Sequence, residues 1–233
     1  MHIPDGFIDA PTSVAAAAVA AGGLAVGLRR SAEVLEEKQA PMAGLVAAFI
    51  FAVQMLNFPV AGGTSGHLLG GVLAAVLVGP WAGALCLSVV LAVQALMADG
   101  GLTALGLNIV NMALVGALAG YGVFLLARRV LPATRTGVVT ASWVAAFVSV
   151  VLAAGAFTVQ YAIGGTGGVS LGRVATAMLG VHALIGIGEA VITAMTVSAV
   201  LGVRPDLVYG ATHLASRPVA VAGRSADPAA VGG

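Results

Sequence analysis

The residues with the clearest chemical capacity are the first six, Met1-His2-Ile3-Pro4-Asp5-Gly6. A free α-amine followed directly by histidine offers three nitrogen donors: the amine, the backbone nitrogen of His2 and the His2 imidazole. These close two adjacent chelate rings and lie in one plane, so a fourth nitrogen would complete a square that suits Ni(II), Cu(II) and related late first-row ions. Pro4 stiffens the exit and Gly6 permits a turn. The alternative is that His2 follows the start methionine by chance, and the rest of the chain must decide.

The composition is that of an integral membrane protein. Of 233 residues, 60% are hydrophobic and 8% are charged, whereas a soluble domain carries about 25% charged residues. The net charge of +1 argues against a nucleic-acid partner. The single cysteine, Cys86, is predicted to be a small buried residue. No basic residue precedes Arg29, so we expect no cleavable signal peptide and a retained Met1.

Seven apolar runs predict an all-α membrane protein with about seven transmembrane helices. The runs cover residues 12–28, 42–58, 67–78, 81–98, 102–127, 138–163 and 174–201, and the third is short for a span. We expect residues 1–207 to form the transmembrane metal-binding domain. Residues 208–233 are rich in Pro, Gly, Ala and Ser and predict a disordered cytoplasmic tail.

Basic residues orient this topology, because positive charge marks the cytoplasmic side. With the N-terminus outside and the C-terminus in the cytoplasm, nine of the ten basic residues lie inside, Arg173 being the exception. Met1, His2 and His67 then share the outer face. His67 follows a glycine-rich loop at the start of the third run, so it is the candidate for the fourth nitrogen.

Four segments carry a resemblance to a known family: MHIPDGF at the start, NFPVAGGTSGHLLGG (Asn57–Gly71), QALMADGGLTALGLNIVNM (Gln94–Met112) and HALIGIGEAVIT (His182–Thr193). Together they resemble the CbiM/NikM family, the substrate-specific membrane (S) components of energy-coupling factor (ECF) importers for cobalt or nickel. The resemblance runs from Met1 to about Leu207. It implies that the metal ligands are Met1, His2 and His67.

The resemblance also implies a setting for the protein. The cargo would be Co²⁺, supplied to cobalamin biosynthesis, or Ni²⁺, with no cofactor of the chain's own. The partners would be a transmembrane coupling (T) subunit, ATP-binding cassette ATPases and a small separate CbiN/NikN-type subunit. The sequence contains no GxxxxGK[ST] phosphate loop, so any ATP hydrolysis belongs to other chains. We expect a bacterial plasma membrane location, with the metal site on the extracytoplasmic side.

Other polar residues are expected to support this site or the bundle. Asn57, Asp99, Asn108 and Asn111, with Gln94, are predicted to orient the ligands and loops. His182 and Glu189 lie about two turns apart on the last apolar run. We favour hydrogen bonds across helices for both over a role in the ion path. Asp5 is expected to bind its own local backbone in a turn.

Two other classes of function remain open. Gly63-Thr64-Ser65-Gly66 matches the GxSG pattern of rhomboid intramembrane proteases, with His182 as the base, although the Trp-Arg pair of that family is missing. The second open alternative is a metal permease that transports its ion without an ATPase. Small residues at four-residue spacing around Ala16 and Ala20 predict close helix packing, either with a coupling subunit or within the chain itself.

Overall fold

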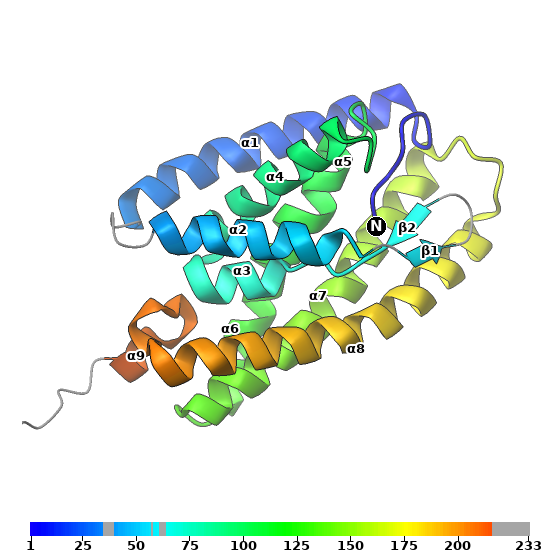
Figure 1. The fold of residues 1–233 in the computed structure, drawn as a ribbon. Coiled ribbons are helices and arrows are strands. Elements are labelled where there is room, and N and C mark those ends of the chain that lie inside the picture. Colours follow the sequence, from blue (N-terminus) through cyan, green and yellow to red (C-terminus); the bar gives the residue numbers. More distant parts are fainter. Residues whose placement is uncertain (35–39, 57, 61–63, 216–233) are drawn as a thin grey trace, which may run out of the picture.

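The computed structural model describes residues 1–34, 40–56, 58–60 and 64–215, and most of these residues are helical (Figure 1). The helices follow the apolar runs of the sequence. They are α1 (Ala10–Val34), α2 (Ala40–Gln54), α3 (Gly71–Val78), α4 (Pro80–Leu96), α7 (Arg135–Gly164) and α8 (Leu171–Val203). The fifth run forms α5 (Leu105–Asn108), the π-helix η2 (Ile109–Ala119) and α6 (Gly120–Val130) without a break.

Helix length separates these elements into two groups. Within the described residues, four helical segments are long and apolar enough to cross a membrane: Ala10–Glu33, Leu105–Val130, Arg135–Gly164 and Leu171–Val203. α2 and α4 are shorter apolar helices. α3 has 8 residues and rises only about 12 Å, so it does not cross a bilayer alone. The prediction of a helical fold with helices able to span a membrane is confirmed, and the third run contributes a helix too short to span.

α3 forms the centre of the bundle. All 8 of its residues are buried, as expected for a helix that is apolar on every side. It contacts α4, α7 and η2 most extensively. Gly71 permits the approach to η2, since a Cβ there would lie 2.5 Å from the carbonyl carbon of Gly116.

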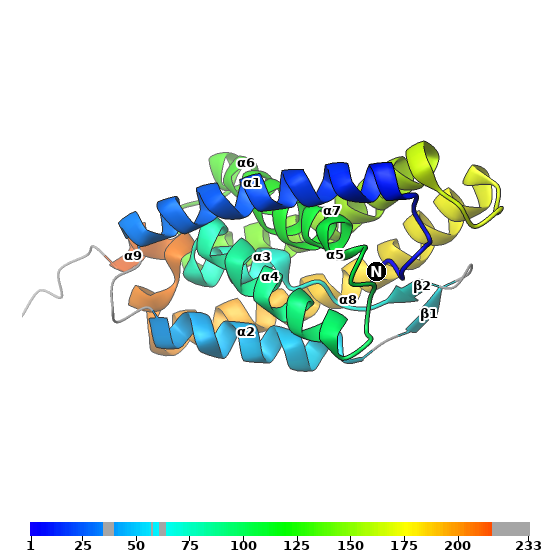
Figure 2. The ribbon, with the colours of Figure 1, turned by 90° about the horizontal axis from the view of Figure 1, so that it is seen from above.

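The first and the last described residues lie at opposite ends of the bundle. Figure 1 places the N-terminus near the hairpin of β1 (Phe58–Val60) and β2 (Thr64–Gly66), and α9 (Thr212–Ala215) at the far end. β1 and β2 pair antiparallel, with Phe58 opposite Gly66. The described residues of the glycine-rich stretch are therefore strand rather than helix, and the sequence analysis did not predict these strands. Figure 2 shows the N-terminal arm, residues 1–9, turning back from α1 into the bundle.

The folded region extends further than the sequence predicted. After α8 come η3 (Pro205–Leu207), η4 (Tyr209–Ala211) and α9, and both Val208 and Ala211 are fully buried. The expectation of disorder from residue 208 was wrong for residues 208–215, because these apolar side chains pack onto the bundle. Residues 216–233 lie outside the described part of the chain.

Two of the small residues of α1, Ala16 and Ala20, face the chain's own interior. Ala16 and Ala20 are 9% and 3% exposed. Ala17 lies against α5, where a Cβ on Gly106 would come 2.4 Å from the Ala17 Cα. At these positions the spacing serves internal packing, one of the two outcomes that the sequence left open.

We predict that Gly71→Ala destabilises the protein by about 1–3 kcal/mol, because the added methyl group overpacks the contact of α3 with η2. Gly22→Ala on α1 is the control, since a Cβ there has no heavy atom within 4 Å. The control should be neutral or slightly stabilising, as alanine favours helix. Thermal unfolding of both variants in the same detergent checks this, and equal melting temperatures would contradict it.

Candidate metal centre

The N-terminal arm is held inside the protein by the segment that follows α4. Ile3 N donates to Asn108 Oδ1 at 2.8 Å, and Asn108 Nδ2 donates to Ile3 O at 3.3 Å. Gly101 N also donates to Ile3 O, at 2.9 Å. Met1 and Ile3 are fully buried. The terminus is therefore a fixed internal element, although most chain ends are frayed.

Further contacts fix the arm at the protein surface. Asp5 Oδ1 accepts hydrogen bonds from Thr103 N at 2.8 Å and Thr103 Oγ1 at 2.5 Å, and these bonds lower the pKa of the Asp5 carboxyl. Asp9 N donates to Gly164 O at 2.7 Å, and Thr166 N donates to Phe7 O at 3.1 Å. The expectation that Asp5 binds its own local backbone was wrong, because Thr103 offers both donors.

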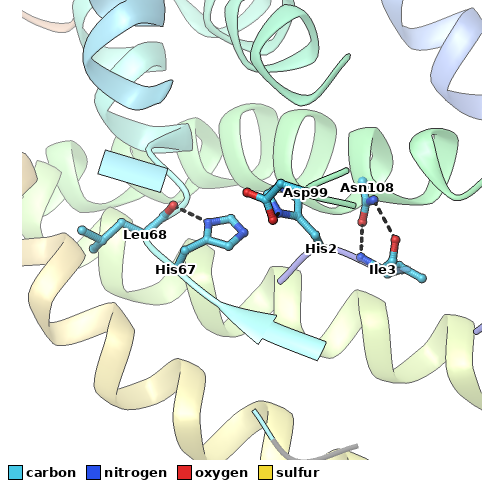
Figure 3. A network of polar contacts seen from close by, with 6 residues as sticks. All are labelled: His2, Ile3, His67, Leu68, Asp99 and Asn108. Atoms are coloured by element: carbon cyan, nitrogen blue, oxygen red, sulfur yellow. Dashed lines mark hydrogen bonds and ion pairs between the residues drawn. The ribbon is translucent and has the colours of Figure 1, made fainter. Parts of the chain in front are cut away.

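The two candidate histidines meet at the inner end of the arm. The ring centroids of His2 and His67 are 4.3 Å apart, with an angle of 32° between the ring planes. Both side chains are buried, His2 at 4% exposed and His67 at 0%. Figure 3 shows the rings side by side, His2 from the arm and His67 from the segment after β2. Positions 2 and 67 of the chain are therefore brought together, as the topology predicted.

One nitrogen of each ring is already engaged. His67 Nδ1 lies 2.8 Å from Leu68 O and donates to it, which makes Nε2 the nitrogen with the lone pair. His2 Nδ1 lies 3.1 Å from Asp99 Oδ1. Among the described residues, neither Nε2 atom has a hydrogen-bond partner. Gly100 has φ +111 and lies against His2, since a Cβ on Gly100 would come 3.3 Å from the His2 Cβ.

Burial favours the neutral forms of the Met1 amine and the His2 imidazole. Loss of water lowers the pKa of the Met1 amine well below its ordinary value, and Asp99 opposes this only in part. Burial likewise lowers the pKa of His2, although the hydrogen bond to Asp99 opposes this in part. An amine or imidazole must be deprotonated to bind a metal. Burial therefore favours the deprotonated amine and imidazole that a metal requires.

The side chains alone do not make an ordinary metal site. In the part of the chain that the structure describes, no cluster of three or more His, Cys, Asp or Glu residues is placed to hold an ion. Two neutral imidazoles beside a buried amine are a nitrogen set, which suits late first-row ions better than Mg²⁺ or Ca²⁺.

The residues predicted to support the site divide into two groups. Asp99 contacts His2, and Asn108 holds Ile3, so both act on the arm. Asn111 does not, because its Nδ2 donates to Gln160 Oε1 on α7 at 2.8 Å. Asn57 lies outside the described residues. Gln94 is fully buried. Burial lowers the pKa of His2, and the Gln94 amide opposes this lowering in part.

Glu189 and His182 differ in their contacts. Glu189 of α8 accepts from Leu69 N and Gly70 N at 2.5 and 2.8 Å. It thus bonds outside its own helix, but to the non-helical segment before α3 rather than to another helix as expected. His182 Nδ1 lies 2.8 Å from Met178 O on its own helix, so the bond predicted across helices is not the one it makes. Sequence reasoning missed Thr103 and Gln54, the latter a polar residue within the apolar run that forms α2.

Comparisons with known proteins agree on a single family. Residues 2–207 match the family model CbiM, described as "Cobalt uptake substrate-specific transmembrane region". The cobalt transport protein CbiM of Sorangium cellulosum is 37% identical over 178 residues, covering 72% of this chain and 76% of that protein. The fused nickel transport protein NikMN of Rhodobacter capsulatus is 42% identical over 130 residues, covering 55% of this chain and 38% of the fused protein. A solved truncated transition metal transporter superposes with a TM-score of 0.81 at 31% identity, covering 87% of this chain and 99% of the solved one.

We predict that Asn108→Ala loosens the arm, because it leaves the buried N–H and C=O of Ile3 without the asparagine amide. The expected loss of stability is about 1–3 kcal/mol, with faster amide exchange in the peptide that carries residues 2–5. Asn111→Ala is the matched control, since it removes a buried amide that bonds α7 instead. Hydrogen exchange by mass spectrometry separates them, and equal exchange of the arm in both variants would refute the assignment.

Proposed function

The chain belongs to the CbiM family of cobalt uptake substrate-specific transmembrane regions, and on this basis we propose that it is the S component of an ECF importer for Co²⁺ or Ni²⁺. Its relatives are cobalt and nickel transport proteins, so the chain is a membrane component of metal transport and not an enzyme. These relatives exclude the protease alternative, because their family is one of metal transport proteins.

The proposed ligands are the Met1 amine, the His2 backbone nitrogen and imidazole, and the His67 imidazole. The observation that carries this proposal is the burial of a free chain terminus beside two imidazoles whose centroids lie 4.3 Å apart. Nδ1 is the His2 ring nitrogen that closes a six-membered chelate ring with the His2 backbone nitrogen. Since Nδ1 contacts Asp99, metal loading requires a rotation of this ring that frees Nδ1 and leaves Nε2–H as the donor available to the carboxylate.

The proposed topology has seven crossings, with the N-terminus outside. The third crossing combines the segment 64–70 with the short helix α3, and it is enclosed by the longer helices. Non-helical backbone is tolerated at membrane depth only where protein surrounds it, and Gly66, His67 and Leu69 are indeed buried. This orientation puts the metal site on the extracytoplasmic side of a bacterial plasma membrane.

Energy must come from other chains if transport is active. The sequence has no phosphate loop, which supports ATP-binding cassette ATPases and a coupling T subunit as partners. The fused NikMN relative supports association with a small N-type subunit, which here would be a separate chain. A metal permease that needs no ATPase is the remaining alternative. Metal uptake by the chain alone in proteoliposomes would favour it.

We predict that two residues added before Met1 abolish high-affinity Ni(II) or Co(II) binding, because they turn the Met1 amine into an amide and put the new amine too far from His2 to share its chelate. Calorimetric titration of the extended and authentic proteins measures the effect. Two residues added after Gly233 are the control and should change nothing. Undiminished binding by the N-terminally extended protein would refute the proposed chelate.

We also predict that Ni(II) binding at pH 7 releases about one proton, from the backbone nitrogen of His2. The amine and the His2 imidazole should release few, because burial lowers the pKa of each and favours its neutral form before binding. As the pH falls through these lowered pKa values, protons compete for the lone pairs and affinity declines. Titration in buffers of different ionisation enthalpy counts the protons. Release of none would exclude amide coordination, and release of three would show that the donors start protonated.

A further inference from the structure

A single peptide group connects His67 to a carboxylate on a distant helix. The peptide between Leu68 and Leu69 has its C=O on one side and its N–H on the other. His67 Nδ1 donates to Leu68 O at 2.8 Å, and Leu69 N donates to Glu189 Oε2 at 2.5 Å. The order of contacts is therefore imidazole, peptide group, carboxylate.

The surroundings make this connection specific. Glu189 is 2% exposed, and its other oxygen accepts from Gly70 N at 2.8 Å. Gln54 Nε2, from α2, donates to Leu69 O at 2.6 Å. Two helices thus hold the backbone next to His67 by its polar groups. A buried carboxylate is costly in a membrane interior and needs a reason to be there.

We propose that Glu189 is a positioning residue for His67, holding the ring and strengthening its Nε2 as a donor through the Leu68–Leu69 peptide. This inference rests on the proposed metal site. Histidines that bind metals commonly donate their second N–H to a carboxylate or a backbone carbonyl, which fixes the ring and raises its basicity. Here both partners act in series. The carboxylate polarises the peptide, the carbonyl becomes a stronger acceptor for Nδ1–H, and electron density at Nε2 rises.

The competing explanation is purely structural. Leu69 and Gly70 directly precede α3, and a carboxylate that satisfies their N–H groups would stabilise the entry to this helix whether or not a metal binds. The two explanations differ in one measurable respect. A positioning role acts only through His67, and therefore vanishes when His67 is absent.

The test is a double-mutant cycle on Ni(II) affinity, using the full chain with its authentic N-terminus in detergent. The variants are Glu189→Gln, His67→Ala and their combination. Glutamine keeps the size of the side chain but offers one acceptor oxygen, so one buried N–H loses its partner. Thr193→Val is the matched control, being 1% exposed and one turn further along α8. Competition with a chromophoric chelator gives the affinity, and visible absorption reports the ligand field of bound Ni(II).

We expect Glu189→Gln to weaken Ni(II) binding about 10-fold and to move the absorption band of bound Ni(II) to longer wavelength. In the His67→Ala background the same change should leave the weaker residual affinity unaltered, and Thr193→Val should leave it unaltered in either background. Glu189→Asp, which keeps a carboxylate with a shorter reach, should give a smaller loss that also depends on His67. If Glu189→Gln does not fold, this variant decides the question.

Three outcomes would overturn the proposal. An equal loss of affinity with and without His67 would place the effect elsewhere in the site. A lowered melting temperature with unchanged affinity and spectrum would leave Glu189 a stabilising contact of α3. Wild-type protein that binds no Ni(II) would refute the proposed metal site itself, and so is distinguishable from a failure of the Glu189 proposal alone.

Discussion

Burial of the free chain terminus is the constraint on which the arrangement of this site depends. An ammonium group in an apolar interior is expensive, and the pKa of the Met1 amine accordingly falls well below its ordinary value. The arm that carries this amine has no helix or sheet of its own to satisfy its backbone. Its polar groups bond instead to Gly101, Thr103 and Asn108. The segment after α4 therefore has to be a loop that follows the arm residue by residue, rather than a continuation of the helix.

The same constraint explains why α3 is short. If the third apolar run were helical from residue 67 onward, the backbone around His67 would be satisfied within the helix. Instead the chain reaches His67 as extended backbone, and α3 begins only at Gly71. Outside a helix, the backbone of Leu69 and Gly70 needs other hydrogen-bond partners. Gln54 donates to the carbonyl of Leu69, and Glu189 accepts from the N–H groups of Leu69 and Gly70. Polar side chains on α2 and α8 are thus placed where non-helical backbone enters the bundle, and each compensates a group that lipid would leave unpaired.

Much of this was predictable from the sequence. Apolar runs located the helices, and basic residues put positions 1, 2 and 67 on one face, because membrane burial and charge placement act on composition alone. The chemistry of an amine next to His2 pointed to nitrogen donors. The sequence did not reveal that Asp5 bonds Thr103, that Asn111 bonds Gln160, or that residues 208–215 fold. Each of these three features depends on which distant segments come into contact in the folded protein, and local sequence patterns do not predict such contacts.

The proposed donor set also bears on which ions such a protein takes up. Neutral nitrogen donors offer little to hard ions such as Mg²⁺ or Ca²⁺, which prefer oxygen. Coordination by a backbone nitrogen further requires an ion that can displace its proton, and the planar chelate favours ions that accept a square. The loop after α4 holds the backbone of the arm, which carries the amine, the His2 backbone nitrogen and the His2 ring. The fourth, on His67, depends on contacts from α2 and α8. A relative movement of these helices would therefore alter one ligand and leave the other three in place, which is a physical route by which a partner that moves α2 or α8 would weaken the grip on the ion.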